Sequence, residues 1–357
     1  MGPDRYDRQI RLQGFGVEGQ ERLKNSRVLV VGAGGLGVPA GLYLNAMGVG
    51  TLGIADGDVI ETSNLHRQPV YRAEDVGKRK IEVLADHLRA QNPNTRIELY
   101  PEFLQPSNAL EILEGYDLVV DATDRIPTRY LLDDACVIRR IPWVYGALHG
   151  FEGQLSVFNY REGPTYRCLY PQIPKPGEIP DCNQLGTLGV LPGIIGTLQA
   201  LEAVKVICEL GDVLSGRLLL FNALDQQTRQ MRFPKDPVQA VREIRDDSHY
   251  HASVCETGGA ISVGEYQERI RDGKPHLLVD VREAEEFVAF HLPEALNIPL
   301  MELQERITEL QDSGEVYLIC KSGSRSAQAY RALEGQLRGV SLKWILGGVQ
   351  DLQAQPL

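Results

Sequence analysis

The sequence predicts an α/β fold, in which a doubly wound domain is followed by a smaller α/β domain with a central parallel sheet. Apolar runs of strand length alternate with stretches of helical length from residue 28 onward. A polar, charged stretch interrupts this alternation at 236–260, after which it resumes. Because such alternation is typical of parallel sheets covered by helices, we expect two domains, at 1–235 and 261–357, joined by a linker at 236–260.

The first domain is expected to contain a regular series of strands and helices. An uninterrupted apolar run bounded by glycine indicates a buried strand at 28–31. The pattern then predicts a helix at 39–48, a strand at 51–58, a helix near 78–91, a strand near 95–100, a helix near 107–114 and a strand at 117–124. A Pro- and Gly-rich loop at 170–182 is too long for a simple connector, and loops of that length are usually functional or disordered.

In the second domain, strands are expected within five segments, at 261–266, 276–283, 292–300, 315–319 and 342–348. Length and composition support this two-domain reading, since 357 residues suffice for two domains and a 43% hydrophobic share is that of a globular chain. The net charge of −11 argues against salt-driven binding to nucleic acid or an anionic membrane, which requires clustered Lys and Arg.

The N-terminal segment and the cysteines predict a cytoplasmic protein. The N-terminus has no apolar segment of the secretory type, and no run of about 18 uninterrupted apolar residues predicts a membrane span. The six cysteines are widely scattered, which is typical of a reducing compartment.

A glycine-rich turn follows the first strand. Gly32, Gly34 and Gly37 fit the GxGxxG pattern, which lets a phosphate approach backbone N–H groups at a helix N-terminus. Asp56 lies 19 residues after Gly37, near the spacing at which an acid meets a ribose hydroxyl. The turn therefore predicts a Rossmann-like nucleotide site, which on this pattern alone also fits a nicotinamide- or flavin-dependent oxidoreductase.

Cationic and acidic residues beyond the second strand favour a triphosphate. The block SNLHRQ supplies Asn64 and Arg67, and Lys80 opens the next helix. ATP that loses pyrophosphate needs several such groups, to offset the charge on the leaving group. Asp124 ends a strand where a carboxylate could hold Mg²⁺ between phosphates. The structural alternatives are a solvated surface for Arg67 and Lys80, and a helix cap for Asp124.

Six blocks occur in the order of a known family: RYDRQIRL, GAGGLG, ADGD with SNLHRQ, GKRK, DATD and a downstream Cys182. Over residues 5–235 the sequence resembles the molybdopterin-synthase and thiamine-biosynthesis adenylyltransferases, MoeB and ThiF, which are relatives of ubiquitin-activating enzymes. The resemblance implies adenylation of the C-terminal glycine of a small ubiquitin-like sulfur carrier that ends in Gly-Gly.

The resemblance also implies a role for individual residues. It assigns Gly35 and Asp56 to the nucleotide, the Ser63 block with Asn64, Arg67 and Lys80 to the phosphates, Asp124 to Mg²⁺, and Arg8 to the phosphates of a neighbouring subunit in a homodimer. Arg125 stands where the family usually has Asn, so it would either add charge to the nucleotide site or point away.

The loop cysteine, Cys182, could attack an activated carboxylate to form a thioester, or it could be a structural thiol. The family's structural zinc, which requires two CxxC pairs, is not expected, because Thr165 replaces the cysteine that would precede Cys168. A different site, built from Cys168, His249, His251 and Cys255, is a less favoured alternative to solvated linker residues. Cys136 and Cys208 lie on apolar helical faces and are expected in the core.

The last cysteine opens a Gly/Ser loop between a strand and a helix. Successive N–H groups and the helix dipole would stabilise a thiolate or a persulfide there. The predicted persulfide loop comprises Cys320, Lys321, Ser322, Gly323, Ser324 and Arg325. Cysteine phosphatases use a similar loop, but they normally place five residues rather than four between Cys and Arg. Residues 260–357 resemble a rhodanese domain, in which Cys320 would carry the persulfide.

Together, the two resemblances predict an adenylyltransferase and sulfurtransferase. ATP and Mg²⁺ would convert the carrier's terminal carboxylate to an acyl-adenylate. The Cys320 persulfide would then attack it, and cleavage by a thiol such as Cys182 would release a thiocarboxylate. The sulfur donor expected from the resemblance is a cysteine desulfurase or thiosulfate. The alternatives are a carrier-binding scaffold that is non-catalytic or performs only the adenylation, and an NAD-dependent oxidoreductase.

Overall fold

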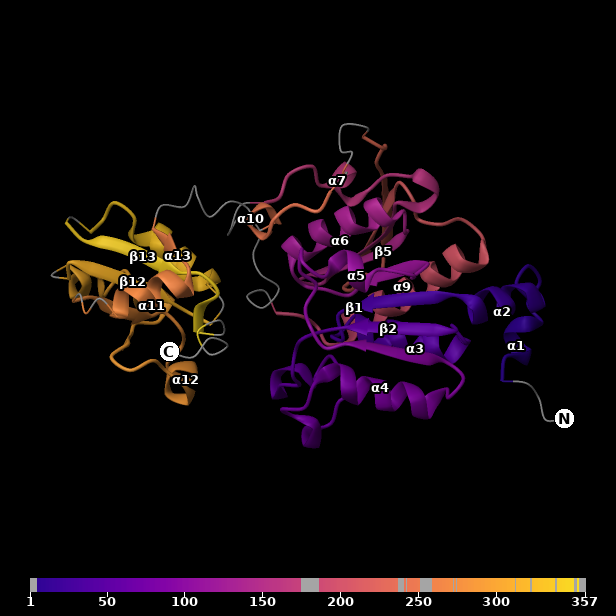
Figure 1. The fold of residues 1–357 in the computed structure, drawn as a ribbon, viewed down its shortest axis with the longest axis horizontal. Helices are drawn as coiled ribbons and strands as arrows, with labels where there is room; N and C mark the ends of the chain where they lie inside the picture. The colour runs from indigo at the N-terminus through magenta and orange to yellow at the C-terminus, as the bar shows by residue number, and fades with distance from the viewer. Residues whose placement is uncertain are drawn as a thin grey trace. The chain divides into compact units, whose positions relative to one another are not determined.

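The computed structural model describes residues 5–174, 186–236, 241, 243–250, 259–271, 273, 275–311, 313–321, 323–337, 339–349 and 352. These residues form two compact units, one with the described residues of 5–173 and 186–250, and the other with those from 259 onward together with Pro174. Each unit is built on one sheet with accompanying helices (Figure 1), so the predicted α/β fold class is confirmed.

The first unit contains an eight-stranded sheet in the order β3-β2-β1-β4-β5-β6-β7-β8. Its strands are β1 (Arg27–Val31), β2 (Thr51–Ala55), β3 (Arg96–Tyr100), β4 (Leu118–Asp121), β5 (Trp143–His149), β6 (Glu152–Phe158), β7 (Arg217–Asn222) and β8 (Thr228–Arg232). Its helices are α1 (Asp7–Ile10), α2 (Gly16–Asn25), α3 (Gly37–Met47), α4 (Lys80–Gln91), α5 (Ala109–Ile112), α6 (Ile126–Arg139), α7 (Tyr166–Leu169), α9 (Val190–Cys208) and α10 (Asp247–Tyr250).

The first five strands in this order are parallel and are covered on both faces. Alternate residues of β1 point to opposite faces. Val28 and Val30 pack with residues of α3, α4 and α9 in one hydrophobic core. Leu29 and Val31 pack with residues of α5 and α6 in another. This arrangement is the predicted doubly wound one, with α5 shorter than the helix expected near 107–114.

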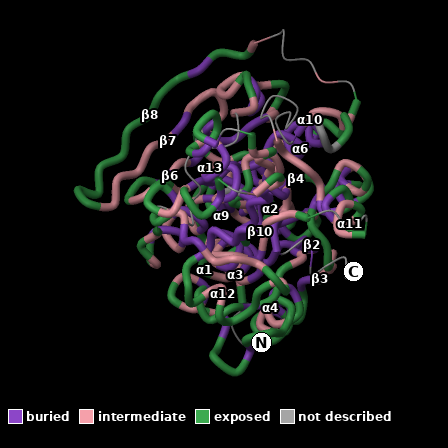
Figure 2. Tube along the Cα trace, turned by 90° about the vertical axis from the view of Figure 1, so that its left-hand side faces the viewer, coloured by how far each residue is buried: buried purple, intermediate pink, exposed green. Residues whose placement is uncertain are grey.

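An antiparallel extension, β6 to β8, was not predicted from the sequence. β5 and β6 form a hairpin, and β7 and β8 continue the sheet in antiparallel register. All five residues of β8 are exposed, as Figure 2 shows at the edge of the sheet. A solvated strand of this kind carries no apolar alternation, which is the signal that sequence reasoning uses.

The helix α9 is long and apolar enough to cross a membrane by length and composition, with a mean hydropathy of 1.5. It packs against α3, β5 and β6, and Leu191, Ile195 and Ala203 belong to the core of the first unit. Burial against the sheet therefore accounts for the apolar composition of this helix.

The second unit contains a five-stranded, fully parallel sheet in the order β11-β10-β12-β13-β9. Its strands are β9 (Ala260–Ile261), β10 (Leu277–Asp280), β11 (Leu296–Asn297), β12 (Glu315–Ile319) and β13 (Ser341–Ile345). Its α-helices are α11 (Val263–Arg271), α12 (Ala284–Ala289) and α13 (Ser324–Leu333). Each strand lies within or at the border of a segment where the sequence predicts one.

Candidate functional site

In the first unit, the carboxyl ends of four neighbouring strands are tied together by backbone hydrogen bonds. Gly32 N–H donates to Ala55 O at 2.8 Å, and Ala122 N–H donates to Val31 O at 2.8 Å. Asp56 N–H donates to Tyr100 O at 3.2 Å. The segments that follow β1, β2 and β4 are thus held at one edge of the sheet, where ligands of open α/β folds bind.

The glycine-rich turn after β1 is tight at two positions. Gly32 has φ +105, and a Cβ there would lie 2.6 Å from Ala122 O. A Cβ on Gly37 would lie 1.8 Å from Gly32 O. The Tyr71 hydroxyl donates to Ala33 O at 2.7 Å and fixes the turn from the other side. The turn therefore leads directly into the N-terminus of α3, as a phosphate cradle requires.

Asp56 follows β2 and faces this turn. Its carboxylate accepts the N–H groups of Ala33 at 2.6 Å and Asp58 at 2.7 Å. Burial raises the pKa of Asp56, while the nearby Lys80 ammonium and the two N–H donors act in the opposite direction. The carboxylate is thus fixed beside the glycine turn, with lone pairs left for a ligand hydroxyl.

The predicted cations differ in their surroundings. The Lys80 side chain is 7% exposed, and Nζ pairs with Asp58 Oδ2 at 2.8 Å. Arg67 is half-buried and donates to Ser63 O at 2.7 Å. Asn64 is buried, and its Oδ1 accepts the N–H of Glu61. Lys80 is therefore part of the interior of this edge and not a solvated surface residue.

Three residues without a role in the sequence analysis also belong to this edge. Gln68 is buried near Gly34, and its Oε1 has no hydrogen-bond partner among the described residues. Arg129 donates to Thr123 O at 2.8 Å and pairs with Asp121 at 3.3 Å, which holds the loop after β4. Tyr71 is the third. The glutamine stands in the SNLHRQ block, but nothing in the sequence distinguished Arg129.

Asp124 and Arg125 lie in the loop after β4 and are both exposed. The N-cap of α6 is Arg125, with no side-chain cap hydrogen bond, so the alternative role of Asp124 as that cap is wrong. The described residues contain no group of three or more His, Cys, Asp or Glu side chains that could hold a metal. Proteins nevertheless often bind Mg²⁺ through a single carboxylate, and substrate phosphates and water supply the other ligands.

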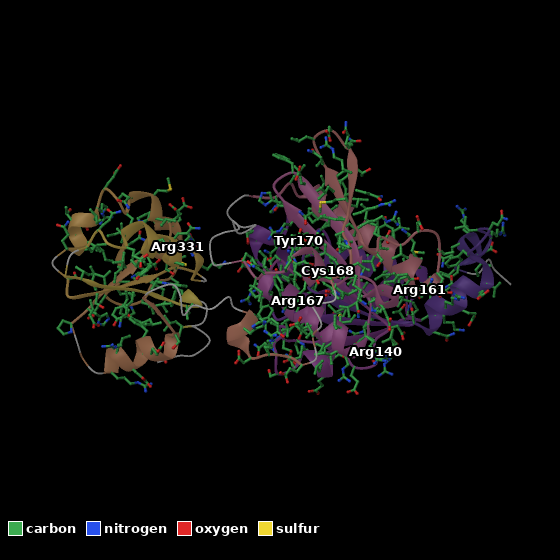
Figure 3. All side chains as sticks on the ribbon, turned by 90° about the horizontal axis from the view of Figure 1, so that it is seen from above. Arg140, Arg161, Arg167, Cys168, Tyr170 and Arg331 are labelled. Atoms are coloured by element: carbon green, nitrogen blue, oxygen red, sulfur yellow. The ribbon has the colours of Figure 1, made fainter. Side chains whose placement is uncertain are left out.

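Cys168 stands where the family has a zinc-binding cysteine, and hydrogen bonds hold its sulfur in place. Its Sγ accepts the N–H groups of Thr165 at 3.4 Å and Asp236 at 3.3 Å. Figure 3 labels it beside Arg167, which pairs with the buried Asp134 at 2.7 Å. His251 and Cys255 of the alternative zinc site lie outside the described residues. Cys136 and Cys208 are buried, as predicted.

In the second unit, Cys320 lies directly after β12 and is 1% exposed. Its Sγ accepts the N–H of Gly323 at 3.1 Å, and Gly323 has φ +90 just before α13 begins. The Cys320 carbonyl oxygen accepts the N–H of Val349. A Cβ on Gly348 would lie 2.2 Å from the same oxygen. The loop therefore directs the backbone N–H of Gly323 at the sulfur, next to the N-terminus of α13.

The positive charge of Arg325 is paired with a carboxylate. Its guanidinium forms two hydrogen bonds with the Glu286 carboxylate of α12, at 2.6 and 2.8 Å. The same pair lowers the pKa of Glu286 and raises that of Arg325. Lys321 is exposed, whereas Ser322 and the Ser324 side chain lie outside the described structure.

Two predicted residues remain, Arg8 and Cys182, and the described structure tests neither role. Arg8 is exposed in α1, and it has no ion pair with the described residues. Cys182 lies outside the described residues, so its role stays a prediction.

The chain thus combines an α/β unit with a glycine-rich turn at the carboxyl edge of its sheet and a second α/β unit with a buried cysteine between a strand and a helix. The chain matches the ThiF family over residues 6–241 and the rhodanese-like domain over residues 262–355. It belongs to the ThiF family, with a rhodanese-like domain following the ThiF domain.

The chain is similar over nearly its whole length to proteins of the adenylyltransferase and sulfurtransferase type. The chain is 40% identical to adenylyltransferase and sulfurtransferase MOCS3-1 of Zea mays over 376 residues, covering 97% of this chain and 80% of that protein. It is 40% identical to MOCS3 of Caenorhabditis briggsae, covering 97% of this chain and 93% of that protein. The chain is therefore an enzyme of the adenylyltransferase and sulfurtransferase class.

Solved structures agree on the fold of the first unit. E. coli MccB with ATP superposes with a TM-score of 0.56 at 20% identity, covering 67% of this chain and 73% of that one. PaaA superposes with a TM-score of 0.54 at 25% identity, covering 65% of this chain and 73% of that one. These likenesses support the α/β architecture.

Proposed function

We propose that this protein uses ATP to adenylate the C-terminal glycine of a small ubiquitin-like sulfur carrier, and then transfers sulfur to it from a persulfide on Cys320. The observation that carries the proposal is the buried Cys320 sulfur, which accepts the Gly323 N–H at 3.1 Å, on the same chain as a ThiF domain. The product would be a carrier thiocarboxylate.

In the first step, a carboxylate oxygen of the carrier attacks the α-phosphorus of ATP, and the bond to pyrophosphate breaks. Asp56 would accept a ribose hydroxyl, and the turn at 32–37 would cradle the phosphates. Lys80, Arg67 and Asn64 would offset charge that builds on the departing pyrophosphate. Mg²⁺ held by Asp124 would supply further neutralisation when bound.

In the second step, the terminal sulfur of the Cys320 persulfide attacks the acyl carbonyl and releases AMP. The resulting acyl-disulfide is then attacked at Sγ of Cys320 by a thiolate, which frees the carrier thiocarboxylate and leaves a disulfide on Cys320. Cys182 is the proposed thiol. A small-molecule or protein dithiol must then reduce this disulfide before Cys320 accepts the next sulfur atom.

The surface around Cys320 favours a protein persulfide, of the cysteine desulfurase class, over thiosulfate as the donor. The Arg325 charge is already paired with Glu286. Glu285 is exposed in α12 and Glu283 is exposed at its N-cap, and Lys321 is an exposed cation of the loop. Residues 261–357 hold ten Lys and Arg against fifteen Asp and Glu, a net charge of −5. A thiosulfate dianion would be repelled by this charge, whereas a basic protein surface would be attracted.

A homodimer is proposed from the outer surface of the first unit. An apolar hollow of about 530 Å³ lies between α3 and α9, lined by Gly35, Val38, Leu42, Arg67, Val190 and Ile194. Tyr43, Val190 and Leu201 are more than half exposed around it. A second copy covering this surface would bury apolar area next to the glycine turn, and its Arg8 would reach the phosphates.

The cytoplasmic location stays a prediction from the cysteine pattern.

Pyrophosphate exchange tests the first step. With Mg²⁺ and a Gly-Gly-ending carrier, the protein should incorporate labelled pyrophosphate into ATP, and a carrier lacking its last glycine should abolish the exchange. The Cys320→Ala variant is the matched control, because it should exchange pyrophosphate at the wild-type rate. An equal rate of pyrophosphate exchange with the intact carrier and with the carrier lacking its last glycine would overturn the proposed substrate.

A further inference from the structure

One hydroxyl touches the reacting sulfur from inside the second unit. Ser326 is fully buried on the first turn of α13, and its Oγ lies 3.6 Å from Sγ of Cys320. The same hydroxyl donates to Gly323 O at 2.9 Å. The Gly323 N–H in turn donates to Sγ at 3.1 Å. Ser326 and Gly323 are thus joined to each other and to the sulfur.

The two guanidinium groups near the loop are each paired with a carboxylate. Arg325 is held by two hydrogen bonds to Glu286, and Glu283 adds a further negative charge nearby. Arg282 forms a closed, buried pair with Asp280 at the end of β10. Because both guanidinium groups are already paired, neutral donors carry much of the stabilisation of a buried thiolate.

We propose that Ser326 is a catalytic residue of the persulfide loop, whose hydroxyl donates a hydrogen bond to the Cys320 thiolate. In the thiol form, the S–H group donates to Ser326 Oγ while the hydroxyl donates to Gly323 O. On loss of the thiol proton, the hydroxyl turns by rotation about one bond and donates to Sγ. This inference rests on the proposed function only in taking Cys320 as the sulfur-carrying residue.

The test is the rate of iodoacetamide alkylation of Cys320 in the full-length protein, followed by peptide mass spectrometry from pH 5 to pH 10. Ser326→Ala removes the hydroxyl with little change of volume. It should slow alkylation about tenfold near neutral pH and move the midpoint of the pH profile upward by about one unit, as loss of a hydrogen bond to a charged group predicts. Ser326→Thr, which retains a hydroxyl, should restore most of the wild-type rate.

An unchanged midpoint in Ser326→Ala, or identical profiles for the alanine and threonine variants, would overturn the assignment. Loss of folding would expose the buried sulfur and speed its alkylation, which is the opposite of the expected result. Because the assay needs neither ATP nor a carrier, failure of carrier adenylation with a shifted alkylation profile would reject the proposed function and retain the role of Ser326.

Discussion

The Asp56 carboxylate accepts the backbone N–H of Ala33 at 2.6 Å, so the residue after β2 holds the glycine turn after β1. A second N–H, from Asp58, occupies the other carboxylate oxygen at 2.7 Å. The acid expected to meet a ribose therefore also shapes the phosphate cradle. This dual role makes Asp56 more than a specificity residue.

Replacing Asp56 by Ala should weaken ATP binding about 10- to 100-fold, because two N–H groups lose a charged acceptor and the turn loses its support. Isothermal titration with a non-hydrolysable ATP analogue measures the effect. Asp58→Ala provides the comparison, since it removes the exposed partner of Lys80 and leaves the contact with Ala33 in place. Equal affinities for wild type and Asp56→Ala would contradict the assignment.

Lys80 and Lys78 form a matched pair for testing the phosphate site. The Lys80 side chain is almost fully buried, while that of Lys78 is 55% exposed and pairs with Asp75. Lys80→Met should lower the rate of pyrophosphate exchange about 100-fold, because the charge on the leaving group loses a fixed cation. Lys78→Met should change the rate by less than about twofold. Similar losses in both variants would show that net charge, not position, matters.

We expect Cys168 to bind no metal ion. Its sulfur already accepts two backbone N–H groups, from Thr165 and Asp236. We expect the purified protein to contain far less than one zinc per chain, and its melting temperature to be the same with and without a chelator. Cys168→Ser should change the unfolding free energy by no more than about 1 kcal/mol. Stoichiometric zinc, with a lower melting temperature after chelation, would contradict this expectation.

The Arg325–Glu286 pair should make the stability of the second unit depend on pH. Arg325 lowers the pKa of Glu286. A lowered carboxyl pKa adds stability that is present above the ordinary Glu pKa of about 4.3 and is lost as the pH falls through the lower, folded-state value. The pair is partly exposed, so its contribution is about 0.5–1 kcal/mol.

Glu286→Gln should therefore be less stable than wild type near pH 7. The difference should shrink as the pH falls below the ordinary Glu pKa of about 4.3, and it should disappear once the pH is below the lowered pKa of Glu286 in the folded protein. Urea unfolding at a series of pH values, followed by the fluorescence of Trp344 in a Trp143→Phe background, checks this. A difference that is constant over the whole pH range would show that the ion pair is not its cause.

The parts of the fold that the sequence predicted are those encoded locally. The strand at 28–31 and the glycine turn are predicted by an apolar run and by four glycines within six residues. The Gly/Ser loop at Cys320 is equally local. In contrast, the hydrogen bonds of Val349 to Cys320 O and of Arg129 to Thr123 O form between residues that no local motif marks, and they depend on how the chain folds. β8 was missed because a fully exposed strand has no apolar face to repeat.

The intact mass of a Gly-Gly-ending carrier tests the central claim most directly. The carrier would be incubated with the protein, ATP, Mg²⁺, a reductant and a persulfide-loaded cysteine desulfurase, with Cys320→Ala in parallel. The account predicts that the wild type exchanges one carrier oxygen for sulfur, whereas the variant yields only the adenylate. A thiocarboxylate formed equally well by Cys320→Ala would contradict the account, because sulfur would then reach the carrier without the persulfide loop.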